Sequence, residues 1–154
     1  MKEIVDLLIK KCKTISTMES CTGGFLVNEI TNIEGASEII KFSAVTYSNE
    51  YKIKMGVNKN LIDKYSVYSI EVAKDMSRVI SDYTSSDYGV GITGKLNKED
   101  KYNQTLNNNV VYASIYDKSN DKYYTLTIEV KDITREQNKK IVVENIIKML
   151  KTIV

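Results

Sequence analysis

A short buried strand that runs into a helix through a glycine-rich turn narrows the folds open to this chain of 154 residues. The run from Thr14 to Glu19 is short and rich in β-branched residues, which favours a strand. Apolar residues recur at helical spacing from Phe25 to Ile30. The turn between them, Ser20 to Gly24, reads SCTGG. Strand, tight turn and helix in this order are typical of an α/β protein.

Further strands are predicted along the chain. Glu38 to Ser48 is β-branched and aromatic, and Tyr88 to Thr93 has the composition of a buried strand that Gly94 ends. Val110 to Tyr116 and Tyr123 to Val130 flank a turn-rich segment and predict a hairpin.

Helices are predicted between and around these strands. Met1 to Cys12 has the pattern of an amphipathic helix, and Asn49 to Tyr65 that of short helical pieces. Ser69 is a good N-cap for a helix that runs to about Thr84. Thr134 and Gln137 form a capping box ahead of a C-terminal helix. We read the polar stretch from Gly94 to Asn109 as a loop.

The order of these elements predicts a three-layer α/β/α sandwich with a mixed β-sheet. The length fits one domain, residues 1–154, and a hydrophobic content of 42% is enough for a single packed core. We therefore look for one site on one domain.

Composition excludes several classes of function. The net charge is only +2 and no basic block is interleaved with aromatic residues, so nucleic-acid binding is not expected. The apolar run near the N-terminus is interrupted by Asp6 and is too short to span a membrane, so we expect a soluble cytoplasmic protein. Cys12 and Cys21 match no metal or redox spacing.

The chain contains no histidine. A Ser-His-Asp triad, a Cys-His pair, a histidine-ligated zinc and a histidine general base are therefore impossible. Any catalysis must take its base from Lys, Tyr, Asp or Glu.

The turn after the first strand allows two interpretations of Ser20. In one, the hydroxyl attacks a carbonyl while free N–H groups at the positive helix end stabilise an oxyanion. In the other, Ser20 or Thr22 only caps the helix and the glycines only permit the turn. The pattern alone favours the cap. Cys21 is a rival nucleophile, but without a histidine we expect a buried structural thiol.

Three motifs resemble those of the CinA C-terminal domain family. They are ESCTGG at residues 19–24, VTYSNEYK at 45–52 and GITG at 91–94, in this order and spacing. The resemblance covers most of the chain and implies the α/β/α sandwich of that family. Its stand-alone members are amidohydrolases that convert nicotinamide mononucleotide to nicotinic acid mononucleotide and ammonia, in pyridine nucleotide salvage.

The resemblance implies that Ser20 is the nucleophile and that Tyr47 and Lys52 activate it. A lysine base working near pH 7 needs a pKa about 3 pH units below its value of about 10.4 in water, which costs about 4 kcal/mol. Tyr47 would relay the proton or bind the oxyanion. On composition alone, Lys52 would be an ordinary surface lysine and Tyr47 an aromatic residue at a strand end.

The resemblance also implies a small nucleotide substrate whose phosphate needs hydrogen-bond donors. The residues we predict for substrate binding are Thr22, Gly23, Gly24, Thr93, Gly94 and Arg135. An arginine exposed at the start of a helix is an equally good interpretation of Arg135. No metal and no cofactor is implied, and a homo-oligomer is expected.

One segment departs from the family pattern. After the motif at 91–94 the family continues with a glycine- and proline-rich loop, whereas this chain has KLNKEDKYNQT and no further glycine. Bulky Lys95, Leu96 and Asn97 cannot adopt left-handed backbone conformations cheaply. Three possibilities therefore stay open: the amidohydrolase, a catalytically weak or inactive nucleotide-binding homologue, and an amidase for a different small amide.

Overall fold

Among the residues that the computed structural model describes, 1–96 and 109–154, five strands form one sheet in the order β2-β1-β3-β4-β5. The strands are β1 (Ile15–Glu19), β2 (Ser43–Val45), β3 (Tyr88–Gly94), β4 (Val110–Asp117) and β5 (Lys122–Glu129). β1 pairs in parallel with β2 and β3, and β4 is antiparallel to both β3 and β5. The sheet is therefore mixed, and the carboxyl ends of β1, β2 and β3 share one edge.

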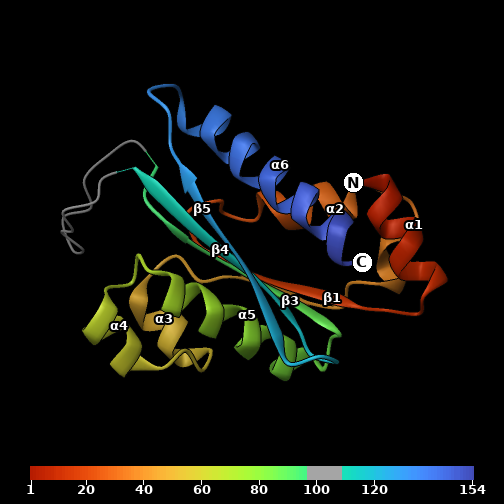
Figure 1. Cartoon of the computed structure of the whole chain (residues 1–154), viewed down its shortest axis with the longest axis horizontal. Coiled ribbons are helices and arrows are strands. Elements are labelled where there is room, and N and C mark those ends of the chain that lie inside the picture. The colour runs from red at the N-terminus through yellow and green to blue at the C-terminus, as the bar shows by residue number, and fades with distance from the viewer. Residues whose placement is uncertain (97–108) are drawn as a thin grey trace.

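Helices cover both faces of this sheet (Figure 1). The helices are α1 (Lys2–Lys10), α2 (Phe25–Thr31), α3 (Asn49–Lys54), α4 (Lys59–Tyr65), α5 (Ile70–Thr84) and α6 (Arg135–Ile153). α1, α2 and α6 lie on one face, and α3, α4 and α5 lie on the other (Figure 1). The chain thus has the predicted α/β/α sandwich.

Each face of the sheet has its own hydrophobic core. The larger core holds Leu8 of α1, Leu26 of α2 and Ile146 of α6. The smaller one holds Met18 of β1 and Met76 of α5. Because β1 lies between the two layers, all five of its residues are buried, including the polar ones.

Glycine lets α5 approach β3 closely. A Cβ atom at Gly91 would lie 2.3 Å from the carbonyl oxygen of Ala73 and 2.6 Å from the nitrogen of Ser77. Any side chain here would therefore push the helix off the sheet. Glycine within a strand often marks such a place, where another part of the backbone approaches closely.

Local capping signals are confirmed. The Ser69 hydroxyl accepts a hydrogen bond from the N–H of Val72 at the start of α5. Thr134 and Gln137 form the capping box of α6. No helix within residues 1–96 and 109–154 is long and apolar enough to cross a membrane.

The second strand is shorter than predicted. Only Ser43–Val45 pairs with β1, whereas Ala36–Glu38 forms a 3₁₀ turn after Gly35. Ile39 is buried in the larger core and its carbonyl accepts a hydrogen bond from Ile15 N–H. The apolar residues that suggested a strand therefore pack as a turn, since burial does not require strand pairing.

The predicted loop from Gly94 to Asn109 lies largely outside the described residues. Lys95 and Leu96 are described and belong to no helix or strand, as predicted, but their side chains are buried. Lys95 is 5% exposed and Leu96 is 1% exposed.

Candidate active site

Ser20 lies directly beyond the carboxyl end of β1. Its backbone N–H donates to the carbonyl of Ile92 in β3, at an N···O distance of 3.1 Å. The residue is 6% exposed. The sheet therefore holds the backbone of this serine, because the pairing of β1 with β3 continues one residue beyond β1.

Lys52 of α3 contacts the hydroxyl of Ser20. Its Nζ donates to Ser20 Oγ at 3.0 Å and to the carbonyl oxygen of Thr46 at 2.7 Å. Lys52 is 1% exposed, so the interpretation as an ordinary surface lysine is wrong. Lysine is almost never fully buried without a polar partner, and here one partner is the serine hydroxyl.

Ser48 sets the position of this lysine. Its side chain accepts a hydrogen bond from Tyr51 N–H and caps the N-terminus of α3. The preceding Thr46 N–H donates to the carbonyl of Glu19. The segment from 46 to 52 is therefore tied to the end of β1 before it turns into the helix that carries Lys52.

The carboxylate of Glu19, which is fully buried, organises the turn. It accepts hydrogen bonds from Thr22 Oγ1 at 2.6 Å, Gly24 N at 3.1 Å, Leu26 N at 3.2 Å, Val27 N at 2.9 Å and Thr17 Oγ1 at 3.3 Å. An anion that accepts hydrogen bonds from several N–H groups at the start of a helix replaces a side-chain N-cap.

This arrangement corrects the expectation that the turn offers free N–H groups at the helix end. The N-cap of α2 is Gly24 and no side-chain cap is present at that residue, so the interpretation of Ser20 or Thr22 as the cap is wrong. Sequence reasoning missed the role of Glu19. The available signal was a carboxylate at the end of a buried strand, three residues before a threonine.

Not every backbone donor of the turn is taken. Gly23 N–H donates to the carbonyl of Ser20 at 3.0 Å, and Gly24 N–H is taken by Glu19. Thr22 N–H has no hydrogen-bond acceptor within the described part of the chain. Gly23 and Gly24 both have left-handed backbone conformations, with φ of 64° and 90°, which explains why glycine occupies these positions.

Tyr47 and Arg135 lie together at the rim of the site. Tyr47 is 64% exposed, and its hydroxyl accepts a hydrogen bond from Arg135 Nη2 at 3.3 Å. Arg135 Nη1 donates to the carbonyl of Leu96, just beyond β3. No hydrogen bond joins Tyr47 to Ser20 or Lys52 among the described residues.

Thr93 and Gly94 end β3 at the same edge of the sheet as Ser20. The Thr93 hydroxyl is fully buried and donates to the carbonyl of Val67. A Cβ atom at Gly94 would lie 2.5 Å from Val111 Cα of β4. The Thr93 side chain thus already has a protein acceptor, and Gly94 packs its backbone against the neighbouring strand.

A second cation of α6 lies over the turn. A Cβ atom at Gly23 would lie 3.4 Å from Nζ of Lys139. Within the described ranges this ammonium has no hydrogen bond or salt bridge. Lys139 follows Arg135 by four residues, so both side chains project from one face of α6. No sequence motif marked Lys139, although its spacing from Arg135 was visible.

Cys21 is a poor nucleophile despite its place beside Ser20. Burial raises the pKa of its thiol to about 12, and the nearby charge of Lys52 only partly offsets this. The thiolate is the reactive form of cysteine. A buried structural thiol, as expected from the sequence, fits these facts.

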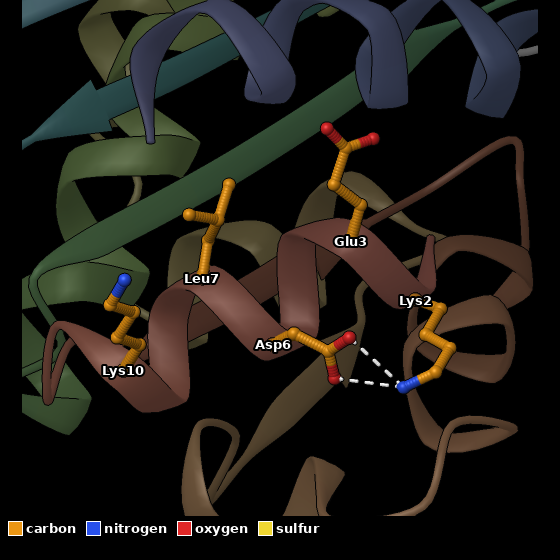
Figure 2. Close-up of a pocket in the computed structure, with 5 residues that line it drawn as sticks. All are labelled: Lys2, Glu3, Asp6, Leu7 and Lys10. Atoms are coloured by element: carbon orange, nitrogen blue, oxygen red, sulfur yellow. Dashed lines mark hydrogen bonds and ion pairs between the residues drawn. The ribbon is translucent and has the colours of Figure 1, made fainter.

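No group of three or more Cys, Asp or Glu side chains in the described ranges is placed to hold a metal ion. A surface depression on α1 is lined by Lys2, Glu3, Asp6, Leu7 and Lys10, with Lys2 paired to Asp6 (Figure 2). It includes neither Ser20 nor Lys52 and does not extend the site.

The arrangement can perform acyl transfer. Its parts are a serine hydroxyl, a buried lysine 3.0 Å away and the free N–H of Thr22 in the same turn. A nucleophile within hydrogen-bond reach of a base is the usual signature of covalent catalysis.

Comparison with known proteins identifies relatives. The whole chain, residues 1–154, matches the model of the CinA C-terminal domain. A protein of Clostridium kluyveri with the provisional description competence-damage inducible protein is 45% identical over 96 residues, or 61% of this chain. A protein of Caldanaerobacter subterraneus subsp. tengcongensis with the same description is also 45% identical over 96 residues. These matches cover 23% of each relative, so the matched part of this chain corresponds to about a quarter of their length.

Solved structures share the fold at low sequence identity. A CinA superfamily protein from Escherichia coli has a TM-score of 0.83 at 22% identity, over 92% of this chain and 81% of that one. A competence or damage-inducible protein from Enterobacter asburiae has a TM-score of 0.87 at 21% identity, over 99% of this chain and 95% of that one.

Proposed function

Because this chain belongs to the CinA C-terminal domain family, we propose that it is an amidohydrolase that converts nicotinamide mononucleotide to nicotinic acid mononucleotide and ammonia. The observation that carries the proposal is the buried hydrogen bond between Lys52 Nζ and Ser20 Oγ in a chain without histidine. A lysine beside a serine can replace the histidine of a triad as the general base.

The first half-reaction would form an ester on Ser20. The neutral amine of Lys52 takes the proton of the Ser20 hydroxyl as Oγ attacks the carbonyl carbon of the amide. The carbon–nitrogen bond then breaks, and Lys52 returns the proton to the leaving nitrogen, which departs as ammonia. The position of Lys52 favours this role, since its Nζ lies 3.0 Å from Ser20 Oγ.

The second half-reaction would use water. Lys52 accepts a proton from a water molecule that attacks the ester carbon, and the acid is released as Ser20 regains its proton. Thr22 N–H is the donor in the turn that could stabilise the oxyanion in both halves. Tyr47 would assist proton transfer or bind the oxyanion. No metal or organic cofactor enters these steps.

The phosphate of the substrate would bind on the α6 side of the turn. Lys139 places an ammonium group over Gly23, and Arg135 lies one helical turn before it. Cations at this spacing suit a phosphate group. A small nucleotide is therefore the substrate that we favour, and we propose that the protein acts as a homo-oligomer in the cytoplasm.

The test compares wild type with Ser20→Ala on nicotinamide mononucleotide, with ammonia and nicotinic acid mononucleotide both measured. We expect both products from wild type, in equal amounts and in the presence of a chelator, and neither from Ser20→Ala. Folded wild-type protein that releases neither product would contradict the proposed substrate. Activity that a chelator abolishes would contradict the mechanism.

A different small amide is the second candidate substrate. Lys95 buries a positive charge directly after Gly94, at the edge of the sheet that carries Ser20. The pyridinium ring of nicotinamide mononucleotide is also positive, and like charges repel. Ammonia release from uncharged or anionic small amides, abolished by Ser20→Ala, would support this candidate.

A further inference from the structure

Arg135 joins three separate segments at the rim of the site. It is the first residue of α6, and its two terminal nitrogens donate to different acceptors. Nη1 binds the carbonyl of Leu96, just beyond β3, and Nη2 binds the hydroxyl of Tyr47, two residues beyond β2. One guanidinium group therefore links α6 to the carboxyl edge of the sheet at two points.

Tyr47 depends on this link for the position of its hydroxyl. Its side chain is 64% exposed, and the bond from Arg135 is its only hydrogen bond among the described residues. An exposed side chain without a partner samples several rotamers, and ordering it costs conformational entropy. The contact with Arg135 selects one of these positions.

The backbone of the residue before Tyr47, in contrast, is anchored beside the Ser20 and Lys52 pair. The preceding residue, Thr46, accepts the hydrogen bond of Lys52 Nζ through its carbonyl. Its N–H donates to the carbonyl of Glu19, next to Ser20. The Cα atom of Tyr47 is therefore held close to the site, and the contact with Arg135 decides where its ring points.

Arg135 is itself well placed to set that direction. Its guanidinium is a rigid planar fork, so the acceptor on one nitrogen orients the other. The capping box of Thr134 and Gln137 holds the helix start from which it projects. Its charge also acts to lower the pKa of Cys21, the neighbour of Ser20, against the larger effect of burial.

From this geometry we infer that Arg135 is a positioning residue, which acts on the reaction through Tyr47 by holding its hydroxyl at the rim of the Ser20 and Lys52 site. The inference rests on the proposed function, in which Tyr47 assists Ser20. It is separate from the phosphate binding proposed above for Arg135, and the two roles can be told apart. A phosphate ligand affects only substrates with a phosphate group, whereas a positioning residue affects the reactivity of Ser20 toward any reagent.

The experiment measures modification of Ser20 by phenylmethylsulfonyl fluoride, which has no phosphate. The serine oxygen displaces fluoride from sulfur, and the enzyme gains the sulfonyl group. Intact-mass spectrometry follows the rate in wild type, Tyr47→Phe, Arg135→Met, Arg135→Lys and the double variant Tyr47→Phe/Arg135→Met. Lys140→Met is the matched control, because Lys140 is an exposed cation of α6 that pairs with Glu136.

We expect Tyr47→Phe and Arg135→Met each to slow the modification about 10-fold, less than the roughly 10²–10⁴-fold of a general base, because Lys52 remains in place as the base in both variants. The double variant should be no slower than either single variant, because both changes remove the same effect, the assistance of the Tyr47 hydroxyl. Arg135→Lys should recover only part of the rate, since lysine lacks the fork. Lys140→Met should react as wild type does.

Two results would count against these ideas, and they differ. If wild type is modified at Ser20 and Arg135→Met reacts at the same rate, or if the two losses multiply in the double variant, the positioning role is overturned alone. If wild type is not modified at Ser20, the serine nucleophile of the proposed function fails, and the role of Arg135 fails with it.

Discussion

Lys52 Nζ lies 3.0 Å from Ser20 Oγ, although the two residues are 32 positions apart in the chain. Both are buried, and the carbonyl of Thr46 also accepts a hydrogen bond from Lys52 Nζ. The base and the nucleophile therefore meet inside the protein, where their hydrogen bond does not compete with bulk water.

Replacing this lysine should abolish activity without unfolding the protein. Lys52→Met keeps most of the side-chain length but removes the base, and we expect about a 10³-fold loss in kcat. Ammonia release under saturating substrate measures it. Lys54→Met is the matched control, because Lys54 lies on the same helix and is 59% exposed. Equal activity of Lys52→Met and wild type would contradict the role of Lys52 as the base.

Glu19 should matter for stability. In Glu19→Gln an amide NH₂ group would face N–H donors such as those of Leu26 and Val27. Loss of charged hydrogen bonds in a buried site should lower the free energy of unfolding by about 2–4 kcal/mol. Urea denaturation measures this value. The exposed Glu34 provides the control, since Glu34→Gln should change it by less than about 0.5 kcal/mol.

Lys95 should reduce the stability of the fold. It is 5% exposed, and its ammonium group lies 5.3 Å from the centroid of the Tyr68 ring, with no hydrogen bond or ion pair in the described ranges. A buried charge without an anionic partner is costly, so Lys95→Met should raise the free energy of unfolding by about 1 kcal/mol. Lys74 is exposed and lies over the Tyr123 ring, so Lys74→Met is the control and should have little effect. A destabilised Lys95→Met would show that the contact with Tyr68 outweighs the cost of burial.

Asp87 should make stability depend on pH in the acid range. Burial alone would raise the pKa of Asp87, but hydrogen bonds from Lys13 Nζ and from the N–H and hydroxyl of Thr14 lower it below its ordinary value. Its stabilising contribution is therefore complete above the pKa of about 3.9 in the unfolded state. It is lost as pH falls through the lower pKa of the folded state.

The corresponding measurement compares urea denaturation of wild type and Asp87→Asn at pH 7 and pH 2.5. The variant should be less stable at pH 7, and its deficit should shrink at pH 2.5, where the wild-type carboxylate loses its advantage. Asp63→Asn changes an exposed carboxylate that pairs with Lys59 and should show a smaller effect. If the loss of stability in Asp87→Asn is the same at both pH values, the effect comes from packing and not from the charge of Asp87.

The two cysteines should differ in reactivity. Cys12 is exposed, whereas Cys21 is buried and burial raises its thiol pKa to about 12. Iodoacetamide at pH 8 should therefore modify Cys12 alone in the folded protein and both residues in urea. Peptide mass spectrometry identifies the modified residue. Rapid modification of folded protein at Cys21 would make it a serious rival to Ser20 as the nucleophile.

Much of the fold was predictable because its signals are local. The capping residues Ser69 and Thr134 act on N–H groups within three residues of themselves, so their effect can be read from a short window. The turn from Ser20 to Gly24 is likewise a local feature. The second strand was overestimated because an enrichment in β-branched and aromatic residues does not say whether burial comes from strand pairing or from packing in a turn.

The site was predictable only in part. Motif spacing selected Ser20, Tyr47 and Lys52. It did not show that Tyr47 accepts a hydrogen bond from Arg135 or that Glu19 accepts hydrogen bonds from the backbone N–H groups of α2. Both facts depend on side-chain direction. A carboxylate at the end of β1 could point to solvent or fold back over the turn, and the packing of α2 against β1 decides between them.

Sequence alone determined the strand-turn-helix unit, the helix caps and the absence of any histidine base, because these depend on composition and on neighbours within a few residues. Tertiary structure decided that Lys52 is buried against Ser20 and that Arg135 reaches Tyr47 across 88 positions of chain. Contacts over such separations depend on how α3 and α6 pack on opposite faces of the sheet, and that packing is a property of the whole chain.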